Sequence, residues 1–150
     1  MRPFLVLVMV STAWSGVTLA QDSEKKVKIG DVPPAVQQAI KQQSAGATLR
    51  GVTQEVEHGQ TLYEAELTVD NHTKDVTFDA NGTVVSVEEE TSLDQVPAPA
   101  RDAIQKAAKG GKLESIERVS ESGKTYYEGH IKVGGKKSEV KVGESGEPVK

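Results

Sequence analysis

The amino-acid sequence predicts an α+β protein of two tandem repeats, each with one helix followed by about four antiparallel strands, and with the helices packed on one sheet face. Two observations predict this fold class. The chain matches itself at one fixed offset, which is typical of a duplicated structural unit. In each copy, apolar residues at helical spacing are followed by segments in which apolar and polar residues alternate, as they do in strands.

The internal match has an offset of 64 positions and needs no gap. Pairs at this offset include Val32-Pro33 with Val96-Pro97, Tyr63-Glu64 with Tyr127-Glu128, and Gly82 with Gly146. We therefore expect repeat 1 at residues 31–90, a linker at 91–94 and repeat 2 at 95–150. The sequence leaves open whether the two repeats share one continuous sheet.

Residues 1–20 have the three-part layout of a signal peptide. Arg2 precedes a short apolar stretch, Phe4 to Val10, and the segment ends on small residues at Ala20. The apolar stretch is too short to span a bilayer, so we expect no membrane insertion after cleavage. The sequence contains no Cys, which excludes disulfides and a lipidated cysteine. The mature chain, with residues 21–30 as an N-terminal extension, is therefore predicted to be exported, either periplasmic or extracellular.

Each repeat opens with a short predicted helix. Pro33-Pro34 suits a first helical turn, because the N–H groups there have no partner within the helix. Val36, Ala39 and Ile40 then follow the i, i+3, i+4 spacing of one helix face, and Gly46 is placed to end the helix. In repeat 2 the same face comes from Ala100, Ala103, Ile104 and Ala107.

Alternating segments follow each helix and predict half-buried strands. In repeat 1, Tyr63, Ala65, Leu67 and Val69 face the core, and Asp70-Asn71 marks a hairpin turn. Repeat 2 shows the same alternation before Gly134-Gly135. The opposite, open face carries Leu62, Glu64 and Glu66 in repeat 1 and Tyr126, Glu128, His130 and Lys132 in repeat 2.

The composition and the motifs argue against several classes of function. The net charge of −4 gives no reason to expect a nucleic acid as partner. The sequence has no nucleophile elbow, phosphate loop, zinc-protease motif or dinucleotide fingerprint, so we predict no enzyme, no catalytic residues and no cofactor. The histidines His58, His72 and His130 lack the spacing of zinc ligands. We expect all three on the solvated surface, with no metal site.

The residues that open and close each copy resemble the PepSY-like family, which includes domains described as similar to the β-lactamase inhibitor protein. The resemblance rests on Val32-Pro33, the Ala39-Ile40 helix, the Tyr63-Glu64 strand and the Gly82 turn into a valine strand, with their counterparts in repeat 2. It implies an exported, non-enzymatic domain that binds a protein or peptide, with inhibition of a peptidase or another secreted enzyme as the theme. The similar inhibitor relies on disulfides, so inhibition of a β-lactamase is not carried over to this chain.

Two function hypotheses follow. The first is a binding module whose open sheet face engages a protein or peptide partner, with Tyr126 as an exposed aromatic anchor. The alternative is a small-ligand or metal-ion binding protein of the cell envelope that uses the acidic surface and His130.

Overall fold

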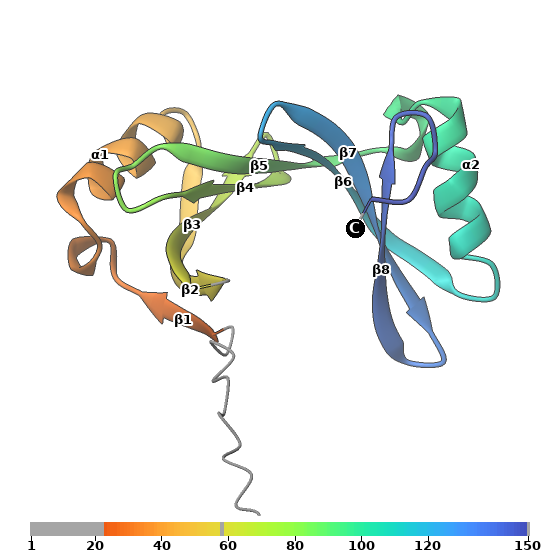
Figure 1. The fold of residues 1–150 in the computed structure, drawn as a ribbon, viewed down its shortest axis with the longest axis horizontal. Coiled ribbons are helices and arrows are strands. Elements are labelled where there is room, and N and C mark those ends of the chain that lie inside the picture. Colours follow the sequence, from red (N-terminus) through yellow and green to blue (C-terminus); the bar gives the residue numbers. More distant parts are fainter. Residues whose placement is uncertain (1–22, 58, 150) are drawn as a thin grey trace, which may run out of the picture.

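The computed structural model describes residues 23–57 and 59–149. Within these residues the chain forms one eight-stranded antiparallel sheet in the order β1-β2-β3-β4-β5-β6-β7-β8, so each strand pairs with its neighbours in sequence. The sheet bends into an arch, and α1 and α2 lie on its outer side (Figure 1). The predicted signal peptide, residues 1–20, lies outside the described residues.

The strands have the following bounds: β1 Ser23–Val27, β2 Thr48–Glu57, β3 Gln60–Val69, β4 His72–Phe78, β5 Val84–Thr91, β6 Lys112–Glu121, β7 Lys124–Val133 and β8 Lys136–Gly143. The helices are α1 Pro34–Gln43 and α2 Ala98–Ala107, which follow the 3₁₀ turns η1 Ile29–Asp31 and η2 Leu93–Gln95. No helix in this part of the chain has both the length and the apolar character needed to cross a membrane.

The predicted fold class of two repeats, each with one helix and about four strands, is wrong. Strand β5 pairs with β6, from Ser86 opposite Glu121 to Thr91 opposite Ile116, so both halves of the chain belong to one continuous sheet. Strand β1 adds an edge to the first half, whereas beyond β8 the described chain makes only an isolated bridge. An unpaired β5 edge would expose a row of backbone N–H and C=O groups, and pairing with β6 satisfies them.

The helices pack on the same face of the sheet, on the sides that their apolar spacing predicts. Val36 and Ile40 of α1 are fully buried against side chains of β2, β3 and β4. Ala100 and Ile104 of α2 are buried against β6, β7 and β8. Gly129 on β7 allows the close approach of α2, because a Cβ there would lie 2.8 Å from Cγ2 of Ile104. The apolar core therefore lies between the helices and the outer face of the arch.

A glycine turn contacts the start of each helix. Gly82 has a φ of +79°, and a Cβ at this position would lie 2.6 Å from the carbonyl oxygen of Ala35. Gly146 has a φ of +85°, and its Cβ would lie 2.7 Å from the carbonyl oxygen of Pro99. Glycine is favoured at both positions by the left-handed backbone and by the close approach. The matched glycines of the sequence thus make the same contact in each half.

Candidate functional site

The face of the sheet opposite the helices lies on the inner side of the arch, and we call it the concave face (Figure 1). Side chains from β2 to β8 line a hollow of about 540 Å³ on this face. Among the described residues, seven glutamates line the hollow: Glu55, Glu57, Glu64, Glu88, Glu121, Glu128 and Glu139. His130 and Lys141 are the basic side chains of the same lining. The hollow is therefore strongly acidic.

Strand alternation and register bring these carboxylates together. Every second residue of a strand points to the same face, and residues opposite each other on paired strands share that face. Glu64 on β3 lies opposite Thr77 on β4, Thr77 lies opposite Ser86 on β5, and Ser86 lies opposite Glu121 on β6. The pairing of β5 with β6 therefore joins the acidic residues of the two halves into one surface.

The structure brings together five of the seven residues predicted for the open face. Those that line the hollow are Leu62, Glu64, Tyr126, Glu128 and His130. Glu66 instead lies 3.5 Å from Nη1 of Arg50. Lys132 is exposed, and its Nζ lies 4.0 Å from Glu114. These two residues lie outside the lining of the hollow.

Two of the glutamates on the concave face have strongly perturbed ionisation. Burial raises the pKa of Glu64 to about 8, and the nearby carboxylates of Glu55 and Asp75 add to the effect. Burial likewise raises the pKa of Glu88 to about 7, helped by Glu128 and Glu117. Both carboxyl groups therefore hold a proton over part of the neutral pH range. The sequence places these residues on a polar face, but it does not reveal that the face is partly buried.

The expectation that Tyr126 is an exposed aromatic anchor is wrong. Its side chain lies in the floor of the hollow, and the residue is only 8% exposed. The hydroxyl donates a hydrogen bond of 3.2 Å to Oε2 of Glu121, and Nζ of Lys141 lies 5.9 Å from the ring centroid. Burial, followed by the charges of Glu121 and Glu128, raises the pKa of the Tyr126 hydroxyl. Side chains of the neighbouring strands, Glu121 on β6 and Lys141 on β8, therefore lie against a ring that alternation alone places on an open face.

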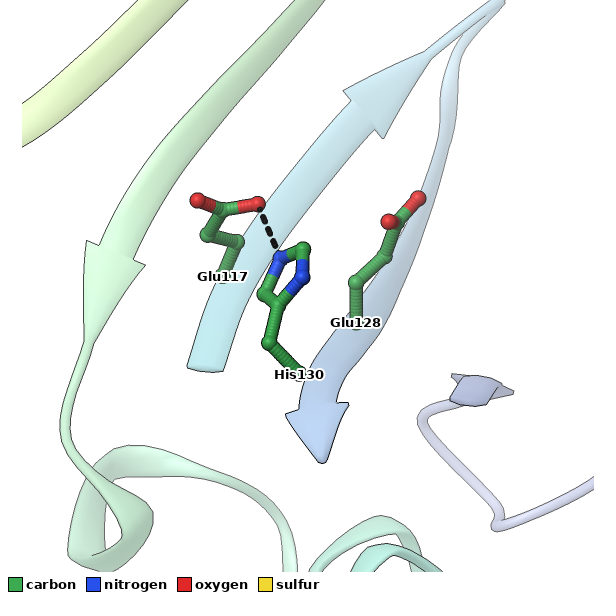
Figure 2. Close-up of side chains that lie close together, drawn as sticks. All are labelled: Glu117, Glu128 and His130. Atoms are coloured by element: carbon green, nitrogen blue, oxygen red, sulfur yellow. Dashed lines mark hydrogen bonds and ion pairs between the residues drawn. The ribbon is translucent and has the colours of Figure 1, made fainter. Parts of the chain in front are cut away.

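His130 lies among carboxylates from three strands, and it is half-buried rather than fully solvated as expected. Its Nε2 lies 3.0 Å from Oε2 of Glu117 on β6 (Figure 2). Its Nδ1 lies 3.6 Å from Oε1 of Glu139 on β8. Burial lowers the pKa of His130, but the hydrogen bond and charge of Glu117 outweigh this effect, so the net change is an increase. Glu117, Glu128 and His130 each offer a ligand atom, and these atoms lie within 4.8 Å of one another. Of the other histidines, His72 is exposed and His58 lies outside the described residues.

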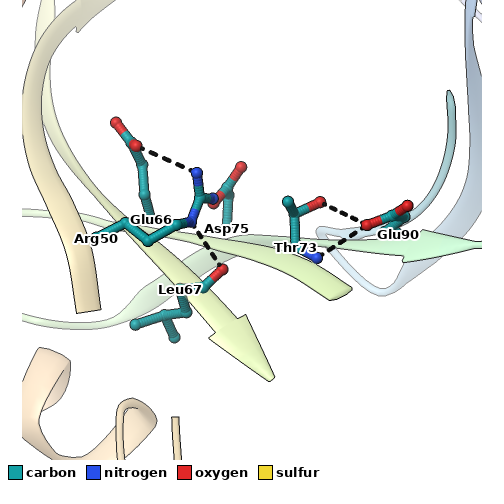
Figure 3. A network of polar contacts seen from close by, with 6 residues as sticks. All are labelled: Arg50, Glu66, Leu67, Thr73, Asp75 and Glu90. Atoms are coloured by element: carbon teal, nitrogen blue, oxygen red, sulfur yellow. Dashed lines mark hydrogen bonds and ion pairs between the residues drawn. The ribbon is translucent and has the colours of Figure 1, made fainter. Parts of the chain in front are cut away.

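Arg50 compensates the acidic charge at the β3–β4 end of the sheet (Figure 3). Its Nη2 donates a hydrogen bond of 2.9 Å to Asp75, and its Nε donates one of 3.2 Å to the carbonyl oxygen of Leu67. Burial raises the pKa of Asp75, although the Arg50 charge opposes this increase. Glu90 accepts a hydrogen bond of 3.0 Å from the backbone N–H of Thr73. In this network the positive charge of Arg50 is therefore paired with the carboxylates of Glu66 and Asp75.

Sequence reasoning missed Glu117, Glu139 and Lys141, which surround the predicted residues Glu128 and His130. Lys141 lies opposite Glu128, and Glu139 lies opposite His130, in the β7–β8 register. The hairpin turn at Gly134-Gly135 could have supplied that register. Glu117 lies opposite Glu128 across β6 and β7, and the alternation on β6 was the available signal.

No protein-family model and no curated protein matches this chain. Solved structures do match it. A DUF2874 family protein from Bacteroides uniformis has a TM-score of 0.62 at 19% identity, with 79% of this chain and 87% of that chain covered. A protein from Bacteroides eggerthii that is proposed to be periplasmic has a TM-score of 0.62 at 20% identity, covering 79% and 86% of the two chains. A BLIP-like protein from Bacteroides fragilis has a TM-score of 0.56 at 22% identity, covering 79% and 84%.

These likenesses establish the fold. The chain folds like the BLIP-like protein of B. fragilis, with a comparable share of each chain covered. Identities near one residue in five do not carry a function from one chain to the other. Membership of the PepSY-like family stays a prediction, because no family model matches.

Proposed function

We propose that this protein is an exported, non-enzymatic binding module whose concave face engages a basic segment of a protein or peptide partner. The observation that carries the proposal is the charge of the hollow, whose lining among the described residues holds seven glutamates but only Lys141 and His130 as basic side chains. An acidic concave surface attracts a basic partner and increases the rate of encounter. Such a surface also disfavours nucleic acid, whose phosphates would be repelled.

The shape of the concave face favours a macromolecular partner. The hollow is open and extends over strands from β2 to β8, whereas small-molecule sites enclose most of the surface of their ligand. Leu62 and Tyr126, each only 8% exposed, add a small apolar area to the lining between the carboxylates. This combination suits Lys or Arg side chains, which pack their aliphatic stems on apolar area and direct their charged ends to carboxylates.

Inhibition of a secreted or periplasmic peptidase, or of another enzyme, is the finer form of this proposal. It is supported by the resemblance drawn from the sequence and by the description of the B. fragilis structure as BLIP-like. Export is supported by the predicted signal peptide at residues 1–20, and a periplasmic location by the B. eggerthii protein. The metal-ion alternative finds support, within the described residues, at the cluster around His130.

Charge reversal on the rim of the hollow tests the proposal. Residues 21–150 would be used to capture native envelope and culture-supernatant proteins, in parallel with the double variant Glu57→Lys with Glu121→Lys. Both glutamates are exposed and line the hollow. The matched control, Asp102→Lys with Glu144→Lys, makes the same change of charge at exposed positions outside the hollow.

We expect the control to retain a captured protein that the rim variant loses, with circular dichroism showing that both variants are folded. Added wild-type protein should then lower the activity of a captured enzyme. Equal capture by the rim variant and the control would overturn the concave face as the binding surface. If an enzyme is captured but its activity does not change, the proposed inhibition is wrong and only the proposed binding is supported.

A further inference from the structure

We propose that Glu117, Glu128 and His130 form a binding site for a divalent transition-metal ion of the zinc class. The three side chains come from two neighbouring strands, with Glu117 on β6 directly opposite Glu128 on β7 and His130 two residues further along β7 (Figure 2). One carboxylate or imidazole atom from each lies within 4.8 Å of the others. No motif in the sequence marks this site, because its ligands meet through strand register.

The distances suit a small ion after a modest closure of the side chains. A tetrahedral zinc ion with bonds of about 2.0–2.2 Å holds its ligand atoms about 3.4 Å apart. Nε2 of His130 and Oε2 of Glu117 already lie 3.0 Å apart. The Glu128 carboxylate is the ligand that must approach, and rotation about its side-chain bonds can bring it closer.

The arrangement of charges independently points to a cation. Glu90, Glu117 and Glu128 lie directly opposite one another across β5, β6 and β7, and like charges in such cross-strand positions are destabilising. Glu128 is also only 4% exposed, and its Oε1 has no hydrogen-bond partner among the described residues. Buried carboxylates normally have such a partner or bind a metal ion.

Lys141 neutralises only part of this negative charge. Its Nζ lies 2.6 Å from Oε1 of Glu128, a close ion pair that neutralises one carboxylate of the cluster. In the described part of the chain, Lys141 is the one lysine or arginine that forms an ion pair within this group of carboxylates, Glu117, Glu128 and Glu139. With a neutral imidazole, a dication would balance the excess negative charge that remains.

The ligand types favour a zinc-class ion over calcium. Imidazole suits zinc, copper, iron and nickel, whereas calcium takes six to eight oxygen ligands. Oε1 of Glu139 lies 3.6 Å from Nδ1 of His130. A carboxylate on that side of the ring orients a histidine so that its other nitrogen faces the metal. Glu139 is therefore the positioning residue of this site.

Calorimetric titration of residues 21–150 with zinc chloride tests the site, with His130→Ala compared with His72→Ala. His72 is the matched control, because it is exposed and its Nδ1 also lies near a glutamate, 3.9 Å from Glu90. We expect one ion per chain in the wild type, an affinity at least about tenfold weaker in His130→Ala, and an unchanged affinity in His72→Ala. Equal affinities in the two variants, or no binding at millimolar zinc, would overturn the site.

If a variant does not fold, the site can still be tested on the wild-type chain, by following its histidine ring signals in nuclear magnetic resonance spectra as zinc is added. In the wild-type chain, zinc should shift the ring signals of His130 and leave those of His72 in place. Shifts confined to His72 would contradict the proposal. The outcome is independent of the proposed partner binding, because Glu57→Lys with Glu121→Lys leaves all three ligands intact and should still bind zinc.

Discussion

Glu64 and Glu88 show how single residues of the concave face resist ionisation. Burial and neighbouring carboxylates both favour the neutral form, and the pKa values rise to about 8 and about 7. A basic side chain or a metal ion in the hollow would favour the ionised form and displace these protons. Binding to the concave face should therefore release protons, and this release would be measurable as a dependence of the binding heat on the buffer.

Replacement of Glu64 by Gln should make the free energy of unfolding less dependent on pH. The folded chain holds the Glu64 proton up to about pH 8, whereas the unfolded chain releases it near the ordinary value of 4.5. Between these values the folded state binds more protons than the unfolded state, so stability falls as the pH rises through the window. Urea unfolding at about pH 5 and about pH 8.5 should show a smaller fall for Glu64→Gln than for the wild type.

Glu144→Gln is the matched control, because Glu144 is exposed and lies outside the hollow. Its unfolding midpoints should follow those of the wild type at both pH values. If Glu64→Gln also follows the wild type, burial of Glu64 does not perturb its ionisation.

At the scale of the elements, the glycine turns at Gly82 and Gly146 should tolerate no larger residue without a loss of stability, because each turn contacts the start of a helix. Gly82→Ala forces a side chain into a left-handed backbone and against the carbonyl oxygen of Ala35, 2.6 Å from the new Cβ. Gly46 has nearly the same backbone, with a φ of +80°, but a Cβ there meets nothing within 4 Å. Gly46→Ala should therefore cost only the conformational penalty of about 1 kcal/mol.

Gly82→Ala should cost clearly more, by at least about another 1 kcal/mol, because the turn must move away from α1. Chemical denaturation of both variants measures the difference directly. Equal losses would show that the turn can shift without weakening its contact with the helix.

The helices and the strand alternation could be predicted because each rests on local periodicity. Val36 with Ile40, and Ala100 with Ile104, are buried as their spacing indicates. The pairing of β5 with β6 could not be predicted, because hydrogen bonds between backbones leave no pattern in side chains. For this reason the sequence left open whether the two halves share a sheet, and the predicted fold class of two helix-plus-strand repeats is wrong although the internal match is extensive.

The candidate site was predictable only in part, for a related reason. Alternation identifies the face on which Glu64, Glu128 and His130 lie, because it depends on one strand at a time. The partners of His130 come from β6 and β8, and the side chains beside the buried Tyr126, Glu121 and Lys141, come from the same two strands. These features require register and shape, which extend beyond any one strand.

For the whole molecule, the β5–β6 pairing decides whether the two halves unfold together. Helix α1 packs on the β2–β4 region, and α2 packs on β6–β8, so each half has its own apolar cluster. The continuous ladder between Ser86–Thr91 and Ile116–Glu121 connects them. Because separation of the halves would expose the paired edges of both strands, we expect the halves to unfold as one cooperative unit.

Ile40→Ala tests this cooperativity, because Ile40 is fully buried on the sheet-facing side of α1 and lies far along the sheet from β7. The substitution should lower the free energy of unfolding by about 2–5 kcal/mol. If the molecule is one unit, native-state hydrogen exchange should show the same loss of protection for the slowest amides of β7 as for those of β3. Ile104→Ala, on the sheet-facing side of α2, should give the reciprocal result. Loss of protection confined to the half that carries the substitution would show that the continuous sheet joins two units that unfold separately.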